Sequence, residues 1–346
     1  MAIDESLIQP ILDGGRLLIT LGDGEVLELG PGLVAPGRDF SDCDLSMVKL
    51  NGANLDGCRF KNTDLTYVDF SNASLIGAEF VDCALVDVIF LRAVLQNAVF
   101  TLCDPAERLR CEQADMSFVK FVEGGKIDNS RFTDASLFGA EFEGIHFEDV
   151  CFNGCDMTGC RFKNVDFETV KLHNVGAVLS AFESCSFNDV ELYDAVLNGS
   201  RFVKCTLGYC GVELNRADLQ NAQFVDCRFG HQGIIGFHAP FADFRGASFC
   251  RSQFMGGVFY GAGFGGAQVV SCGFNESMQE KAAWNGAMVL NSRFRLCHFK
   301  DASLQGMKFL NCSLQEAKFP GAEADAAVFE GCDFGPSVPV REDEAA

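Results

Sequence analysis

The chain of 346 residues lacks the features that mark a membrane-spanning or secreted protein. No stretch approaches the ~20 consecutive apolar residues that a helix needs to cross a bilayer. The first residues, Met1 to Ser6, contain neither a basic patch nor a long apolar run, so a secretory signal is not expected. The cytoplasm is therefore the expected compartment.

The sequence also lacks the spacings that indicate an enzyme or a metal site. It has 17 cysteines but no Cys-x-x-Cys pair, and none of its five histidines has a Cys or Ser partner at the spacing of a zinc site or a catalytic triad. Gly261 to Gly266 match the letters of a dinucleotide-binding loop, yet no helix follows to bind a phosphate. We therefore expect no catalytic residue, no cofactor, no metal and no enzyme.

What the sequence does contain is a period of five. Leu or Phe occupies every fifth position from Phe40 to Phe100, and after shifts of one or two residues the pattern continues to Phe334. We call these positions the centres; they hold 30 of the 34 phenylalanines. Neither a helix nor a strand has this period, so the repeat demands a different backbone path.

A second position repeats two residues before each centre and holds a small side chain, as in Ala53 before Leu55 and Cys58 before Phe60. We call it the slot. Twelve cysteines occupy slots, which predicts that they are buried free thiols acting as small apolar groups; Cys250 lies off the slot and is the best candidate for an exposed thiol. One large and one small inward residue per unit suits a narrow, densely packed core.

This pattern resembles the pentapeptide repeat family. The resemblance implies an all-β fold, a right-handed parallel quadrilateral β-helix with four units per turn and about fourteen turns here. Residues twenty apart should then stack, so that Phe142, Phe162 and Phe182 form one column. The repeat covers 38–334. Residues 1–37 contain two apolar runs around Gly22-Asp23-Gly24 and predict an N-terminal β-hairpin cap, and 335–346 form an acidic C-terminal tail.

Three breaks interrupt the pattern. Residues 101–113 lose the centres, which predicts a bulging loop, and 275–283 place Gln279 at a centre. Residues 231–241 keep the register but carry extra apolar side chains. Irregularity tolerated in a long repeat explains all three; for 231–241 a patch that contacts a partner is the alternative. The candidate contact residues are Ile235, Phe237, His238 and Phe241.

Charge is the remaining clue to function, because the net charge is −21 and acids occupy outward positions in many units. Such a surface repels nucleic acid and attracts basic protein grooves. The main hypothesis is a non-enzymatic protein-interaction or scaffold solenoid that presents acidic polar faces to an unidentified protein. The alternative, implied by the resemblance, is a DNA mimic that binds and protects DNA gyrase. The relatives that do so resemble homodimers joined through a C-terminal helical module, which the short segment after Phe334 is not expected to form.

Overall fold

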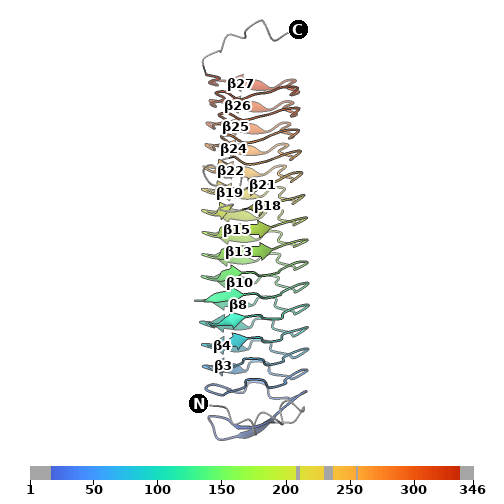
Figure 1. Cartoon of the computed structure of the whole chain (residues 1–346), viewed down its shortest axis with the longest axis vertical. Helices are drawn as coiled ribbons and strands as arrows, with labels where there is room; N and C mark the ends of the chain where they lie inside the picture. The colour runs from blue at the N-terminus through green and yellow to red at the C-terminus, as the bar shows by residue number, and fades with distance from the viewer. Residues whose placement is uncertain (1–16, 208–210, 230–236, 255, 336–346) are drawn as a thin grey trace. The chain divides into compact units, whose positions relative to one another are not determined.

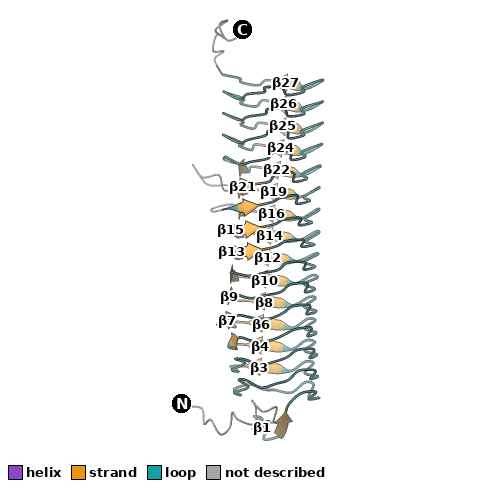
Figure 2. Cartoon of the chain, turned by 45° about the vertical axis from the view of Figure 1, so that its right-hand side comes forward, coloured by secondary structure: helices purple, strands orange, loops and turns teal. Residues whose placement is uncertain are grey.

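The computed structural model describes residues 17–207, 211–229, 237–254 and 256–335, and within these ranges it is all-β. The chain divides into two compact units, residues 1–201 and 202–346, which we call unit 1 and unit 2. The search of the described residues for a helix able to cross a membrane finds none. Short strands separated by turns make up both units, as Figure 2 shows in orange and teal.

The described part begins with the predicted hairpin. Strands β1 (Leu17–Thr20) and β2 (Val26–Leu29) pair antiparallel, with Leu18 opposite Glu28. The turn between them is closed by the Leu21 amide, which donates to the carbonyl of Glu25 at 2.8 Å. Leu21 and Leu29 are buried. The first bridge to the repeat joins Val34 to Asn54, so the hairpin leads directly into the first turn.

Each turn of the repeat has four sides, because the chain bends after every centre. The four sides stack into four flat faces held together by parallel pairing between successive turns. Face 1 and face 2 contain most of the strands. Face 3 and face 4 of unit 1 are ladders of isolated parallel bridges for most of their length, such as Asp69 to Ile89 on face 3 and Ser74 to Val94 on face 4. The two units hold about 13 turns, close to the prediction.

The strands stack in chain order on each face, as Figure 1 shows for the labelled ones. In unit 1, face 1 holds β3 (Arg59–Lys61), β4 (Glu79–Val81), β6 (Val99–Thr101), β8 (Lys120–Val122), β10 (Glu141–Glu143), β12 (Arg161–Lys163) and β14 (Ala181–Glu183). Face 2 holds β5 (Leu85–Val86), β7 (Ala106–Glu107), β9 (Lys126–Asp128), β11 (His146–Glu148), β13 (Asp166–Lys171) and β15 (Ser186–Glu191).

Unit 2 repeats this arrangement. Its face 1 begins with β16 (Arg201–Val203), whose first residue is the last of unit 1. It continues with β19 (Gln223–Val225), β22 (Ser248–Cys250), β24 (Gln268–Val270), β25 (Met288–Leu290), β26 (Lys308–Leu310) and β27 (Val328–Glu330). Its face 2 holds β17 (Thr206–Leu207), β20 (Arg228–Phe229) and β23 (Gln253–Phe254), and β18 (Val212–Glu213) pairs with β21 (Phe237–His238) on face 3.

The centres form the predicted columns inside the units. The ring of Phe162 stacks on Phe142 at 5.1 Å and on Phe182 at 4.9 Å, with interplanar angles of 3° and 4°. Rings from adjacent faces meet edge to face, as Phe162 does with Phe167 at 5.4 Å and 61°. Offset-stacked and edge-to-face contacts are the favoured aromatic geometries, so the five-residue period places nearly every phenylalanine in a favourable pair.

Slot residues do more than fill space. The side chain of a slot Cys, Ser or Thr donates to the carbonyl of a centre one turn earlier: Cys155 to Phe132 at 2.8 Å, Ser180 to Met157 at 2.7 Å and Thr63 to Phe40 at 3.0 Å. A buried donor is satisfied in this way, which explains why polar side chains are tolerated there. Burial raises the pKa of the Cys58 thiol to about 11 and that of Cys160 to about 12. Cys250 is half-buried.

The corners between faces take a left-handed backbone. Many corner residues are Asn, Asp or Gly with φ between +46° and +72°, such as Asn72 at 57° and Gly154 at 72°. These residue types reach this region at the least steric cost. The Gly-rich match at 261–266 has the same explanation: Gly261 and Gly266 are corners, and Phe264 between them is a fully buried centre.

The prediction of a bulging loop at 101–113 is wrong. Ala106 and Cys111 occupy two successive centres, both buried, with small side chains that hide the period. The turn simply contains one residue more, since Phe100 stacks on Phe121 at 4.4 Å. The break at 275–283 also stays in the core: Gln279 is fully buried, donates to Ser277 Oγ at 3.1 Å and accepts from Trp284 Nε1 at 3.3 Å.

Candidate functional site

The repeat places outward side chains of successive turns in register, and on face 2 of unit 1 this brings acids together. The residue after the centre is acidic on four consecutive turns. We call this row the acidic ladder; it consists of Glu107, Asp128, Glu148 and Glu168. The register pairs each with the next, at the ~4.8 Å separation of neighbouring strands. Like charges placed directly opposite one another destabilise a sheet, so packing does not account for the ladder.

Three cationic or titratable side chains lie among these acids. Lys126 contacts Glu148 and Asp128, the latter at 3.4 Å, and Arg108 contacts Glu107 at 3.0 Å. His146 Nε2 lies 3.6 Å from Glu148 and 3.5 Å from Glu168. The hydrogen bond from Lys126 lowers the pKa of Glu148, and the same bond raises the pKa of Lys126.

Two groups on this face bring three possible metal ligands within 4.8 Å of one another: His146, Glu148 and Glu168, and Asp128, Glu148 and Asp149. Both share Glu148, whose carboxylate already contacts the Lys126 ammonium. All are at least partly exposed, and neither group keeps three free ligands while Lys126 holds the Glu148 carboxylate. We therefore regard the ladder as a charged surface rather than as a metal centre.

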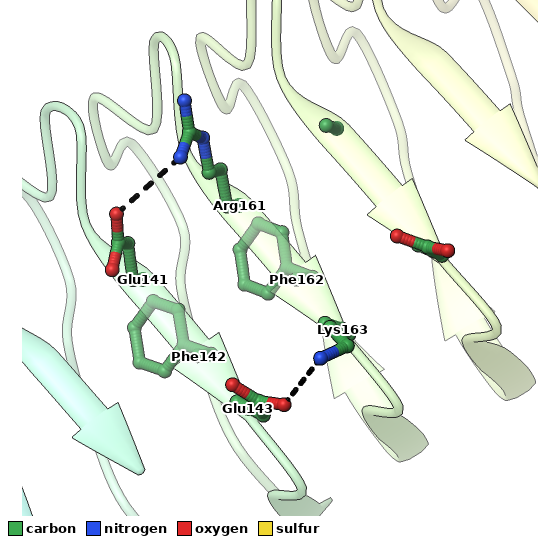
Figure 3. A pocket seen from close by; sticks show the side chains of 8 residues that line it. Glu141, Phe142, Glu143, Arg161, Phe162 and Lys163 are labelled. Carbon is green, nitrogen blue, oxygen red and sulfur yellow. Dashed lines mark hydrogen bonds and ion pairs between the residues drawn. The ribbon is translucent and has the colours of Figure 1, made fainter.

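Face 1 of unit 1 has a different chemistry, because its charges alternate from turn to turn. Figure 3 shows a shallow hollow there, lined by Glu141, Phe142, Glu143, Arg161, Phe162, Lys163, Ala181 and Glu183. Glu141 lies 3.0 Å from Lys120 and 3.7 Å from Arg161, and Glu143 lies 2.6 Å from Lys163. Each of these acids has a lysine or arginine partner of its own, whereas in the acidic ladder Lys126 is shared by two acids and Arg108 also binds Asp87, so the ladder is only partly neutralised.

The predicted contact residues at 231–241 are only partly within the described chain. Ile235 lies outside the described residues. Phe237 and His238 form β21, whose backbone pairs with Val212 and Glu213 of β18. Phe241 is a corner residue, 59% exposed, with its ring edge-to-face to Tyr260 at 5.4 Å. An exposed aromatic group at this break is therefore present, although the patch as a whole remains a prediction.

A second exposed aromatic pair was missed from the sequence. Phe118 and Phe138 are 48% and 42% exposed at the corner of face 4 and face 1 in unit 1, and their rings meet edge to face at 5.4 Å. Both are off-centre phenylalanines. The turn here has twenty-one residues, so Phe118 lies level with Gly139, the residue directly after Phe138. Their separation by about one turn was the signal available in the sequence.

Comparison with known proteins agrees with the repeat seen in the structure. A family model described as pentapeptide repeats matches in 8 copies, at residues 39–75, 130–168 and 297–335. Three segments of the chain thus match the pentapeptide repeat family. No curated protein matches the chain.

Three solved structures show what this chain is similar to. HetL from the cyanobacterium Nostoc sp. strain PCC 7120, a pentapeptide repeat protein involved in heterocyst differentiation regulation, is 12% identical, covering 87% of this chain and 89% of HetL, with a TM-score of 0.20. QnrB1, a plasmid-mediated fluoroquinolone resistance protein, is 14% identical over 59% of this chain and 91% of its own, with a TM-score of 0.24. Rfr23 from the cyanobacterium Cyanothece 51142 is 13% identical over 39% and 91%, with a TM-score of 0.22.

Proposed function

We propose that this pentapeptide repeat protein is a non-enzymatic interaction scaffold that presents its acidic ladder to a basic surface of a protein partner. The observation that carries the proposal is the in-register stack of Glu107, Asp128, Glu148 and Glu168. An arrangement that is unfavourable for folding is retained where something other than packing has shaped the sequence. Charge complementarity with a basic partner offsets the repulsion within the ladder.

The proposal places the protein in the cytoplasm, where thiols such as those of Cys58 and Cys160 stay reduced. A flat row of carboxylates with only partial neutralisation steers a cationic partner and fixes its register along the turns. The mixed-charge face 1 lacks this property, because its acids are paired with Lys120, Arg161 and Lys163.

The test compares two variants with equal changes in net charge. The ladder-neutral variant carries Glu107→Gln, Asp128→Asn, Glu148→Gln and Glu168→Gln. The control variant carries Glu276→Gln, Glu316→Gln, Asp325→Asn and Glu330→Gln in unit 2. Proteins captured from host extract by wild type should be lost by the ladder-neutral variant and kept by the control. Equal capture by wild type and both variants would contradict the proposal.

A DNA mimic acting on gyrase is the second candidate, because the same ladder is a row of regularly spaced negative charges. In a supercoiling assay with and without a quinolone, excess wild-type protein should then change gyrase activity and the ladder-neutral variant should not. If excess wild-type protein leaves gyrase unaffected under both conditions, this candidate is ruled out while the scaffold proposal stands.

A further inference from the structure

Two exposed aromatic pairs in this protein are built alike. Phe118 and Phe138 in unit 1 meet at 5.4 Å and 84°, and Phe241 and Tyr260 in unit 2 meet at 5.4 Å and 84°. In each pair the first residue, Phe118 or Phe241, is at a corner. Its ring packs against the glycine that directly follows the second aromatic residue. A Cβ at Gly139 would come within 2.8 Å of the Phe118 ring, and a Cβ at Gly261 within 2.9 Å of the Phe241 ring.

Folding alone does not favour these corners. A bulky side chain at positive φ is strained, and φ is 60° at Phe118 and 57° at Phe241. Their rings also remain about half exposed, whereas the centres bury theirs completely. Exposed aromatic groups on rigid elements are typical of contact sites for partners.

Unit 2 shows what such a pair can hold. The ammonium of Lys281 lies 5.3 Å from the centre of the Tyr260 ring and donates to Tyr260 Oη at 2.9 Å. Lys281 is itself a corner residue, one turn beyond Gly261. The Tyr260 hydroxyl therefore holds the ammonium at the edge of the ring, within the ~6 Å range over which an aromatic ring attracts a cation.

The pair in unit 1 has no such lysine. The corner one turn beyond Gly139 is Gly159, and a Cβ there would meet nothing within 4 Å. The face that carries Phe138 has no outward Lys or Arg among the described residues of unit 1. Its carboxylates include Asp115 and Asp156, on the turns before and after Ser136. On the adjoining face, Lys120 and Arg161 are both paired with Glu141.

We propose that the Phe118–Phe138 pair is an anchoring site for a cationic side chain, arginine or lysine, of a protein partner. Phe138 has no hydroxyl like that of Tyr260, so the cation lies against its ring and is held by the ring and by the negative charge of Asp115 and Asp156. The inference rests on the proposed function in one respect, namely that the protein partner is basic. The anchoring residues themselves lie on a different face from the acidic ladder.

The experiment measures binding of a fluorescent peptide of alternating arginine and glycine by anisotropy at about physiological ionic strength. A citrulline peptide, which keeps the shape without the charge, serves as the ligand control, and a lysine peptide separates the two cations. The double variant Phe118→Ser with Phe138→Ser should bind the arginine peptide about threefold to thirtyfold more weakly than wild type. The matched control is Leu179→Ser, which removes an apolar corner residue that is 69% exposed and lies on Gly199 in the same way, without a ring.

A second pair of variants keeps the test independent of the aromatic substitutions. Gly159→Lys supplies the unit-1 pair with its own ammonium and should weaken peptide binding, whereas Gly159→Gln should not. If the Phe118/Phe138 variant binds as the Leu179→Ser control does, the anchoring site is refuted. If that happens while the ladder-neutral variant loses binding, the proposed function survives the failure of the inference. If the ladder-neutral variant binds normally and the aromatic variant does not, the inference survives alone.

Discussion

Removing one ring from a core column should weaken the fold locally and strongly. Phe162 is 1% exposed and contacts three rings, those of Phe142, Phe182 and Phe167. Phe162→Ala deletes these contacts and leaves a cavity, which costs about 3–5 kcal/mol for a buried phenylalanine. Each lost ring pair accounts for roughly 0.5–1.5 kcal/mol of that cost.

The assay is urea unfolding followed by far-UV circular dichroism, together with hydrogen exchange of peptides from the affected turns. In a repeat fold each turn contacts only its neighbours, so the loss of exchange protection should concentrate in β10, β12 and β14. The control Phe118→Ala removes a phenyl ring from an exposed corner and should lower the free energy of unfolding by less than about 1 kcal/mol. A loss below about 1.5 kcal/mol for Phe162→Ala, or protection lost evenly across the chain, would refute the column as the unit of stability.

Three further predictions follow from the slots, the buried glutamine and the ladder. In native protein treated with iodoacetamide near neutral pH, the slot residues Cys58, Cys160 and Cys297 should stay unmodified, because burial raises their pKa values to about 11, about 12 and about 11. The half-buried cysteines off the slot, Cys151 and Cys250, should react first, as measured by mass spectrometry of digests, and the reverse order would contradict the slot assignment. Gln279→Ala should destabilise by about 1–3 kcal/mol because it leaves the Trp284 indole donor unpaired. The emission of Trp284, the only tryptophan, reports this unfolding, and Gln279→Glu should restore little, because burial disfavours its charge. Lys126→Met should lower the free energy of unfolding by a roughly constant amount between about pH 5 and about pH 10. Its difference from wild type should vanish as the pH falls through the lowered pKa of Glu148, which contributes stability only while ionised, and as it rises through the raised pKa of Lys126; a difference that grows in acid would contradict the pairing.

Most of the fold could be predicted because a period of five leaves few backbone solutions. The hairpin at β1 and β2, the stacking of Phe142 on Phe162 and the burial of ten of the twelve slot cysteines followed from residue type and spacing. The other two, Cys43 and Cys332, are only half-buried. The period fails where a centre is small. Ala106 and Cys111 occupy centres, yet neither is a large side chain, so the sequence there was mistaken for a loop.

The candidate sites were harder to predict, because outward positions carry no packing constraint. The acidic ladder depends on the register between turns of twenty and twenty-one residues, and the extra residue between Phe121 and Ile127 obscured the alignment of Glu107 with Asp128. The slot hydrogen bonds, such as that from Cys155 to the Phe132 carbonyl, depend on contacts between turns that no local pattern contains. Phe118 and Phe138 were visible as off-centre residues, but their contact depends on a turn of twenty-one residues, which sets Phe118 against Gly139 and beside Phe138.

The register between turns also makes the length of the charged row adjustable. Phe142 and Phe162 are equivalent positions on consecutive turns, as are Phe147 and Phe167. Deleting 142–161 removes one complete turn and joins the chain at equivalent positions of two turns. Asp128 would then become the direct neighbour of Glu168. Duplicating the same segment adds a carboxylate instead. The number of carboxylates in the row can thus be changed one at a time by deleting or duplicating single turns. The affinity of a partner that spans the row should change by one step with each turn removed or added.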